Sequence, residues 1–197
     1  MCKDARGFFA DPFSLSVGHQ YGLSLTELLI TLGLTATLST VGLQSFQYQV
    51  AAAKADVVVG NLRTTLALAR SEAITLDASV VLCRKTDNSV ACAGSSSRGR
   101  PQWRQGWLLF QDVDEDRLYD ADQGDILMRV YPSIDSGFIL KWNRGDFIAY
   151  QGSGTLDSLN GTFCLFSLSA ELGLNRELKI PFTGRVRMTS GECSYEL

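Results

Sequence analysis

Residues 28–53 read LLITLGLTATLSTVGLQSFQYQVAAA, and no residue in this stretch is charged. A helix needs about 20 consecutive apolar residues to cross a bilayer, so the stretch is long enough for one crossing. It is only moderately apolar, and its small and hydroxyl residues suit close helix–helix packing. These residues include Gly33, Ala36, Ser39 and Gly42. The stretch therefore predicts a membrane helix that can also pack closely against other helices.

The same helix is predicted to continue beyond residue 53, because no proline occurs between Phe13 and Arg100. Apolar residues in this second part recur at helical spacing and form one stripe. The stripe consists of Val58, Leu62, Leu66, Ala69 and Ala73. We therefore predict one helix of about 50 residues that ends near Ile74–Leu76, with a transmembrane first half and an amphipathic second half.

The composition is that of a globular protein. The chain has 197 residues, of which 45% are hydrophobic and 20% charged, and its net charge is −3. These values exclude a disordered, collagen-like or polytopic membrane protein, and they leave room for roughly one domain with a real core. A generally basic nucleic-acid coat is excluded as well, so any binding of anions must come from a local cluster.

The rest of the chain predicts short β-strands separated by turns. Several segments alternate apolar with polar residues and are enriched in β-branched and aromatic residues. The predicted strands are Val80–Arg84, Trp107–Gln111, Ile126–Tyr131, Phe138–Trp142, Phe147–Tyr150, Thr162–Leu168, Glu177–Phe182 and Gly184–Met188. We therefore predict an α+β fold class, with β-sheets packed on the second half of the long helix.

The residues before the uncharged stretch read Gly22-Leu23-Ser24-Leu25-Thr26-Glu27. A carboxylate at the start of an apolar segment costs energy in lipid, although a helix dipole favours it at the N-terminus. A glycine, an apolar residue and a glutamate at the fifth position after the glycine resemble the type IV prepilin signature. Leu23 and Thr26 stand where that family prefers Phe and Ile, and neither difference removes the chemistry.

The resemblance implies cleavage after Gly22 by a prepilin peptidase, with Leu23 as a methylated N-terminus. It also implies a type IV pilin-like fold on antiparallel β-sheets. Residues 23–53 would be the transmembrane and filament-core half of the helix, and residues 54–197 the periplasmic helix half and β-rich domain. Glu27 would pair with the amine of Leu23 in a neighbouring subunit and set the axial register of the filament.

Residues 1–22 would be the prepilin leader, which is long for this kind of pilin. The segment from Val17 to Gly22 resembles a short leader that begins at an alternative start codon. We therefore expect residues 1–16 not to be translated in the cell, and Cys2 would be absent with them.

Later segments resemble one branch of pilins, the GspH/FimT family of minor pilins and pseudopilins. The matching segments are 69–74 (ARSEAI), 106–112 (GWLLFQD), 160–163 (NGTF) and 184–187 (GRVR), which together span nearly all of the chain after the leader.

Without Cys2 the chain has four cysteines, Cys83, Cys92, Cys164 and Cys193, which allow three pairings. Proximity in the sequence favours the disulfides Cys83–Cys92 and Cys164–Cys193. A zinc site is disfavoured because the chain has no C-x-x-C pair, and its single histidine, His19, lies in the leader. Disulfides persist in the periplasm, where the resemblance places the domain.

The stretch from Asp112 to Asp125 is acidic and partly follows a calcium-binding loop. It has Asp at the first, third and fifth positions of the EF-hand pattern, but Arg117 at the sixth, where Gly is needed. Gln123 occupies the twelfth position, where a bidentate Glu belongs. We interpret the stretch as a solvated acidic hairpin loop without a metal, and a weak calcium site is the alternative.

Basic residues cluster near residue 100 and near the C-terminus. In an extended strand Arg185 and Arg187 would point to the same face, about 7 Å apart, as successive phosphates of DNA require. Such a Gly-Arg-x-Arg tail resembles the DNA-binding element of the FimT side of the family. Arg185 and Arg187 are thus candidates for binding double-stranded DNA, and the lesser candidates are Arg98, Arg100, Lys179 and Tyr195. The alternative is that these arginines only solubilise an edge strand.

The sequence contains no motif typical of an enzyme, and we expect no cofactor. The resemblance implies a FimT-like minor pilin of the type IV pilus machinery in the bacterial inner membrane, with its globular domain in the periplasm. Its partners would be other pilins and the prepilin peptidase. Two alternatives stay open, namely a pseudopilin H subunit of a type II secretion system, which exports proteins, and a membrane-anchored periplasmic binding protein outside any filament.

Overall fold

The computed structural model describes residues 22, 24–87, 89–157, 160–169, 173–190 and 193–194, with only the backbone described at 40–44 and 190. The chain divides into two units, Met1–Gln44 and Ser45–Leu197. The elements are α1 (Leu25–Leu76), β1 (Val80–Arg84), β2 (Trp107–Gln111), the 3-10 helix η1 (Ala121–Gln123), β3 (Ile126–Val130), β4 (Phe138–Trp142), β5 (Phe147–Tyr150), β6 (Gly161–Ser167), β7 (Arg176–Ile180) and β8 (Arg187–Ser190).

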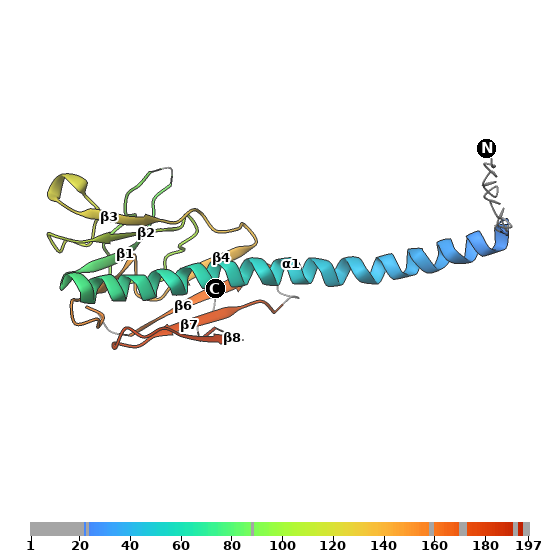
Figure 1. Ribbon diagram of the computed structural model, residues 1–197. Helices are drawn as coiled ribbons and strands as arrows, with labels where there is room; N and C mark the ends of the chain where they lie inside the picture. The colour runs from blue at the N-terminus through green and yellow to red at the C-terminus, as the bar shows by residue number, and fades with distance from the viewer. Residues whose placement is uncertain are drawn as a thin grey trace, which may run out of the picture. The chain divides into compact units, whose positions relative to one another are not determined.

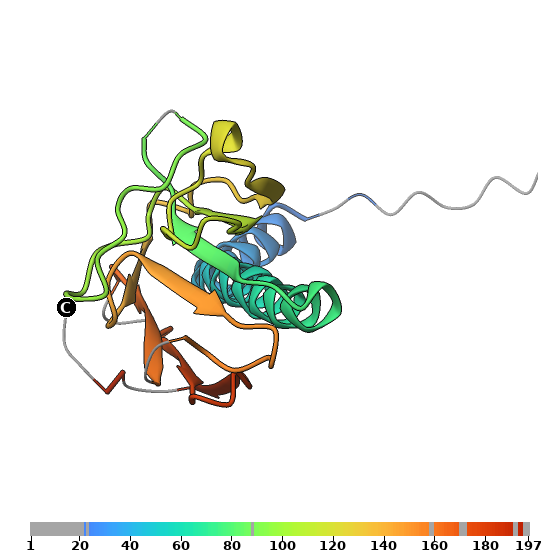
Figure 2. The ribbon, with the colours of Figure 1, turned by 90° about the vertical axis from the view of Figure 1, so that its left-hand side faces the viewer.

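The strands form two antiparallel sheets of four strands each (Figure 1). The first sheet has the order β3-β2-β1-β5, and its central pair aligns Leu82 with Leu109. The second sheet has the order β4-β6-β7-β8, and β6 pairs with β7 so that Phe163 lies opposite Leu178. Figure 2 looks nearly along α1 and shows the strands of the second unit gathered on one side of the helix. The predicted α+β fold is confirmed.

The core lies between the second half of α1 and both sheets. The predicted stripe, Val58, Leu62, Leu66, Ala69 and Ala73, is buried in one cluster with Trp107, Trp142 and Phe163. The indole N–H of Trp107 donates to the hydroxyl of Thr65, 3.3 Å away, so the contact between the helix and the first sheet includes a buried hydrogen bond. Because these side chains leave water together, the helix and the sheets stabilise each other.

A second buried cluster lies on the other face of the first sheet. It contains Val81, Cys83, Leu108, Phe110, Phe147 and Ala149. Tyr119 and Leu127 pack against it, and the rings of Phe110 and Tyr119 are 5.6 Å apart. The loop after β2 therefore helps to cover this sheet, which explains why β1, β2 and β5 read as nearly continuous apolar runs.

Each predicted strand is present, the bounds of β3, β6 and β7 differ from the predictions by one or two residues, and the largest difference is at the end of the chain. The bounds of β1, β2, β4 and β5 match the predictions, and α1 ends at Leu76 as expected. The last strand was expected at Gly184–Met188 but begins only at Arg187. Gly184 has a left-handed φ of 73°, which no strand residue adopts, so the backbone turns there before β8 begins.

Candidate functional site

The first part of α1 exposes apolar side chains. Residues 24–39 are all exposed, and Leu25 and Leu38 keep 76% and 72% of their surface accessible. Glu27 lies in the first turn, is exposed and makes no ion pair with any residue that the structure describes. Gly22 is also exposed, whereas Leu23 lies outside the described residues. This apolar surface needs a covering that the described chain does not supply.

The hydroxyl groups in this apolar stretch are bonded within the helix. Thr31 donates to the carbonyl of Leu28 at 3.0 Å, and Ser39 donates to that of Thr35 at 2.7 Å. Such bonds satisfy the hydroxyl donors, which lowers the cost of placing them in an apolar environment. Among the described residues, no helix combines the length and hydropathy that a membrane crossing requires. The transmembrane half expected at residues 23–53 therefore stays a prediction.

Gly184 determines how the basic tail is placed. A Cβ atom on this glycine would lie 2.6 Å from the carbonyl oxygen of Gly154 and 2.7 Å from the ring of Tyr150. The hydroxyl of Tyr150 donates to the carbonyl of Gly184 at 3.2 Å, and burial raises the pKa of Tyr150, so it stays a neutral donor. The glycine of the Gly-Arg-x-Arg motif is thus required by its φ and by close packing.

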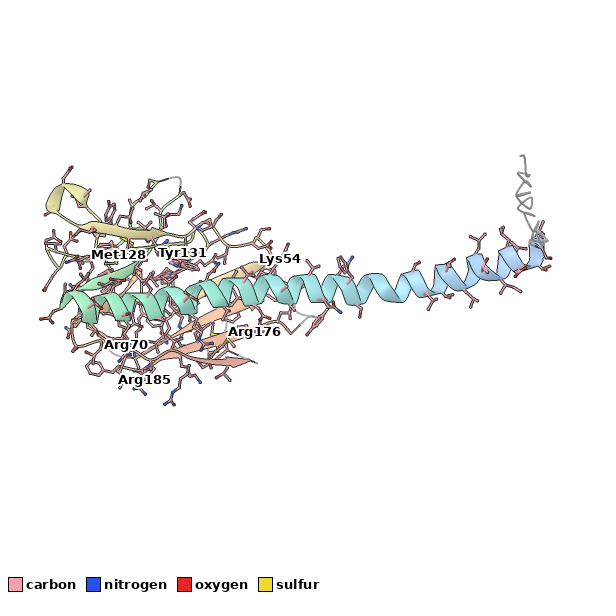
Figure 3. All side chains as sticks on the ribbon, in the orientation of Figure 1. Lys54, Arg70, Met128, Tyr131, Arg176 and Arg185 are labelled. Atoms are coloured by element: carbon pink, nitrogen blue, oxygen red, sulfur yellow. A yellow bond between two sulfur atoms is a disulfide. The ribbon has the colours of Figure 1, made fainter. Side chains whose placement is uncertain are left out.

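Arg185 lies in a groove beside α1. The groove has a volume of about 470 Å³ and is lined by Arg63, Arg70, Ser71, Ile74, Gly184 and Arg185. Figure 3 shows Arg70 and Arg185 near each other, from the helix and from the tail. The Nε atom of Arg70 donates to the carbonyl of Gly154 at 2.9 Å, which fixes the direction of its guanidinium. Three cations therefore converge on this groove.

Arg187 lies in a different groove, next to β6 and β7. This groove, also of about 470 Å³, is lined by Asn160, Thr162, Lys179, Pro181, Thr183 and Arg187. Lys179 and Arg187 are cross-strand partners in the β7–β8 pair. Arg144 reaches the rim, because its Nε atom donates to the carbonyl of Asn160 at 3.0 Å.

The strand that was expected to carry both arginines holds only Arg187, because β8 begins there. The backbone turns at Gly184, so Arg185 precedes the strand, and the two side chains line separate grooves. That both side chains point to the same face stays a prediction. Both residues are nevertheless exposed, so each can meet a ligand in its own groove.

Among the lesser candidates that the structure describes, only Lys179 lines one of these two grooves. Arg98 and Arg100 are exposed but line neither groove. Their loop is held against the β4–β5 turn, where the N–H of Gly145 donates to the carbonyl of Gly99 at 3.2 Å. Tyr195 lies outside the described residues. Arg63, Arg70 and Arg144 were missed, although the spacing of seven between the first two already placed them on one helix face.

Two cations near the tail are ion-paired. Lys179 lies 2.9 Å from the carboxylate of Glu177, and Arg176 lies 3.4 Å from that of Asp56 on α1. Burial opposes ionisation of Glu177, but hydrogen bonds from Ser194 and Lys179 outweigh it and hold the pKa of Glu177 below its usual value. Lys179 therefore carries less free positive charge than the sequence suggests.

Both predicted disulfides are present in the structure. Cys83 and Cys92 are joined across nine residues, with their Cα atoms 5.6 Å apart. Cys164 and Cys193 are joined across 29 residues, with their Cα atoms 5.8 Å apart. The second disulfide ties the end of the described chain to the central strand β6.

An apolar groove beside α1 was not anticipated. Its volume is about 440 Å³, and it is lined by Val50, Lys54, Val57, Trp107, Tyr131 and Ile134, among others. Lys54 and Asp135 both line this groove and form an ion pair of 2.9 Å. The hydrogen bond from Lys54, together with one from the N–H of Gly137, lowers the pKa of Asp135. Figure 3 labels Lys54 and Tyr131.

The acidic stretch after β2 is less solvated than expected. Asp112 and Asp125 keep only 3% and 7% of their surface accessible. The carboxylate of Asp125 accepts hydrogen bonds from the N–H groups of Val113 and Asp120 at 2.9 and 3.0 Å, so it connects two parts of the loop. The interpretation as a solvated hairpin loop is therefore wrong for these two residues, because the loop folds back onto the first sheet.

Two solved structures are similar in fold. One is the type IV minor pilin FimU of Pseudomonas aeruginosa, with 17% sequence identity and a TM-score of 0.49, covering 70% of this chain and 90% of that chain. The other is the minor pseudopilin EpsH from the Type 2 Secretion System of Vibrio cholerae, with 14% identity and a TM-score of 0.48, covering 70% of this chain and 97% of that chain. No curated protein matches the sequence.

The model of one protein family matches residues 58–184 and is described as the type II transport protein GspH. The match starts in the buried stripe of α1 and extends to the glycine that turns the basic tail. It covers more than half of the chain and confirms the predicted resemblance. The chain therefore belongs to the GspH family of type II transport proteins.

Proposed function

We propose that the chain is a FimT-like minor pilin that works as a structural subunit in the biogenesis of type IV pili. The observation that carries this proposal is the exposed apolar surface of α1 from Leu25 to Leu38, which is interrupted by a single acid, Glu27. In water such a surface is unfavourable, since burial of apolar area gains about 25 cal/mol per Å². A membrane before assembly and a bundle of helices after assembly would each provide the burial.

Glu27 gives the assembled bundle its register in this proposal. A carboxylate among apolar helices is costly unless a cation pairs with it. Cleavage after Gly22 by a prepilin peptidase would create such a cation, the amine of Leu23, and a neighbouring subunit would present it to Glu27. One pair per subunit then favours a single axial offset, because any other offset leaves both charges unpaired.

The processing step has a direct test. Protein purified from the native membrane should begin at Leu23, and mass spectrometry of the N-terminal peptide should show a methylated amine. A native protein that still begins upstream of Leu23 would contradict the proposal, because the cationic partner of Glu27 would then be missing.

The assembly step is tested with Glu27→Gln, which removes the charge and keeps the size. We expect the variant to be processed and inserted in the membrane, but to fall at least tenfold in sheared filament fractions. The matched control is Glu72→Gln, which changes the same group later in α1. Normal incorporation of Glu27→Gln into filaments would refute the role of this carboxylate.

A second candidate function is that of the pseudopilin H subunit in a type II secretion system, which the description of the matching family favours. The two roles predict different losses when the gene is deleted. If the chain is a pilus subunit, its deletion should abolish piliation and transformation and leave protein export intact. If it is a secretion subunit, its deletion should leave the exported enzymes in the periplasm, and the pili should still form.

We also propose that the basic tail binds double-stranded DNA weakly during uptake. The support is the pair of grooves beside the tail, one with Arg63, Arg70 and Arg185 and the other with Arg187 and Lys179. Guanidinium groups bind phosphates in a bidentate manner without reading sequence, so the binding should be sensitive to salt and independent of sequence.

The DNA proposal is tested with the double variant Arg185→Gln/Arg187→Gln. We expect it to reduce retention of duplex DNA several-fold at low salt and to lower the slope of log K against log salt by about 2. The control is Arg129→Gln, an exposed arginine on β3 in the other sheet. If the double variant and the control retain DNA equally, the assignment to Arg185 and Arg187 is wrong.

A further inference from the structure

Three carboxylates converge in the loop that follows β2. Asp112, Asp114 and Asp116 each offer an oxygen atom, and these atoms all lie within 4.8 Å of one another. Oxygen ligands of calcium lie 2.3–2.6 Å from the ion, so two ligands of the same ion can be at most about 5 Å apart. The three oxygens are therefore close enough to share one ion.

Asp112 provides an independent indication that a ligand is needed. It is only 3% exposed, and its Oδ1 atom is fully buried and accepts no hydrogen bond from any described residue. A buried carboxylate oxygen without a partner is costly, and a bound cation would offset this cost.

The loop backbone orients the three carboxylates. The N–H of Arg117 donates to Oδ2 of Asp112 at 3.2 Å, that of Asp116 to Oδ1 of Asp114 at 3.3 Å, and that of Leu118 to Oδ1 of Asp116 at 2.7 Å. Each carboxylate thus uses one oxygen to hold the loop. Within the described chain, the other oxygen of each makes no hydrogen bond or ion pair.

The sixth loop position has the conformation that calcium loops require. Arg117 was counted against a calcium site because Gly usually occupies this position. The structure shows that Arg117 adopts a left-handed φ of 68° all the same. Its guanidinium pairs with Asp157 at 2.5 Å and lies over the ring of Phe147, 5.4 Å from the centroid. Asp157 therefore offsets the positive charge that would otherwise oppose a cation.

We propose that this loop binds a calcium ion through the carboxylates of Asp112, Asp114 and Asp116. Calcium fits better than magnesium, because it accepts irregular sets of oxygen ligands, whereas magnesium demands a near-octahedral one. Gln123 replaces the bidentate glutamate of the pattern, so we expect weak binding, with a Kd on the order of 10⁻⁴ to 10⁻³ M as in extracellular modules. The ion would stabilise the loop that covers the second buried cluster through Tyr119.

The test is calorimetric titration of CaCl₂ into the full-length protein in detergent, combined with its thermal unfolding midpoint. We expect saturable binding of one ion, and a midpoint about 3–6 °C higher at ten times the Kd than in EGTA. The variant Asp114→Asn/Asp116→Asn should bind at least tenfold more weakly, and both residues are exposed, so it should fold. Asp122→Asn, an exposed acid of η1 outside the cluster, is the matched control and should bind normally.

Several results would overturn the proposal. One is the absence of calcium binding up to 10 mM, about ten times the weakest affinity expected. Another is an equal rise of the unfolding midpoint with MgCl₂, which would indicate general screening of the acidic loop. A third is unchanged binding in Asp114→Asn/Asp116→Asn, which would place the ion elsewhere. The proposal does not depend on the assembly role proposed above.

Discussion

The two sheets of the second unit differ in how many of their faces are covered. In the first sheet β1, β2 and β5 are buried almost throughout, because α1 packs on one face and the loops with Tyr119 and Cys92 pack on the other. In the second sheet β4 alternates buried with half-buried residues, and Lys179 and Arg187, which are paired across β7 and β8, are both exposed. These three strands of the first sheet thus form a middle layer, whereas the second sheet keeps a face with Lys179 and Arg187 in contact with water.

This difference distinguishes the surroundings of the acidic loop from those of the basic tail. The acidic loop packs on the outer face of the covered sheet, and Asp112 and Asp125 are therefore buried. The basic tail belongs to the open sheet, so Arg185 and Arg187 stay exposed. A buried charge needs a specific partner in place, whereas an exposed charge is solvated by water and can bind a partner that arrives by diffusion. The covered loop therefore suits a bound ion, and the open tail suits an extended polyanion.

The largest effect that we expect comes from the outer layer of the first sheet. Phe110→Ala removes a fully buried ring from the second cluster and should lower the free energy of unfolding by about 3–5 kcal/mol. Thr189→Ala on the open face, opposite Glu177, should change it by less than about 0.5 kcal/mol. Urea unfolding of both variants measures the contrast, and similar losses would mean that the two sheets are equally covered.

The disulfides should rank next, with the larger effect in the open sheet. Loop-closure entropy predicts a loss of about 3.6 kcal/mol for Cys164→Ala/Cys193→Ala and about 2.6 kcal/mol for Cys83→Ala/Cys92→Ala. The reason is the longer loop, 29 residues against nine. Denaturant unfolding of both variants under oxidising conditions tests the order. A greater loss for the Cys83–Cys92 variant would show that packing outweighs chain entropy.

Gly184→Ala should have an intermediate effect, because it combines a strained φ with a close contact. We expect a loss of about 2–3 kcal/mol and a weakened DNA interaction, since Arg185 would be displaced. Gly173→Ala is the control, because Gly173 also has a positive φ, 57°, but a Cβ there meets nothing within 4 Å. That control should lose only about 1 kcal/mol. Equal losses would exclude the contact with Gly154 as a cause.

The smallest effect should be the pH dependence of the open sheet. The pKa of Glu177 is lower in the folded protein than in the unfolded one, so ionised Glu177 stabilises the fold above its unfolded pKa of about 4.5. This stabilisation should be lost as the pH falls below that value through the folded pKa. Unfolding midpoints between pH 3 and 6 measure the loss, and Glu177→Gln should reduce the slope. An unchanged slope in this variant would assign the dependence to other carboxyls.

Most secondary structure was predictable because it depends on local patterns. The spacing of Leu62, Leu66 and Ala69 predicted the buried face of α1, and the runs at 80–84 and 107–111 predicted two strands with correct ends. The end of the chain was not predictable in this way. At Gly184 the carbonyl of Gly154 and the ring of Tyr150 leave no space for a Cβ atom, and both lie far from it in the sequence.

The candidate sites were predictable as residue types but not as assemblies. The Gly-Arg-x-Arg motif drew attention to Arg185 and Arg187, yet Arg185 lies with Arg70 on the helix and Arg187 with Lys179 on β7. The three aspartates of the acidic loop were visible in the sequence. The burial of Asp112 was not, because it results from the packing of the loop on the first sheet.

The sequence by itself determined the long helix, the apolar surface of its first part, the position of Glu27, the strand content and the cysteine pairs. These features follow from periodicity, charge and spacing along the chain, which act locally. Only the tertiary structure decided which sheet is covered, which acids are buried and which cations share a groove. Burial and electrostatic partnership depend on residues that are distant in sequence and meet only when the chain is packed.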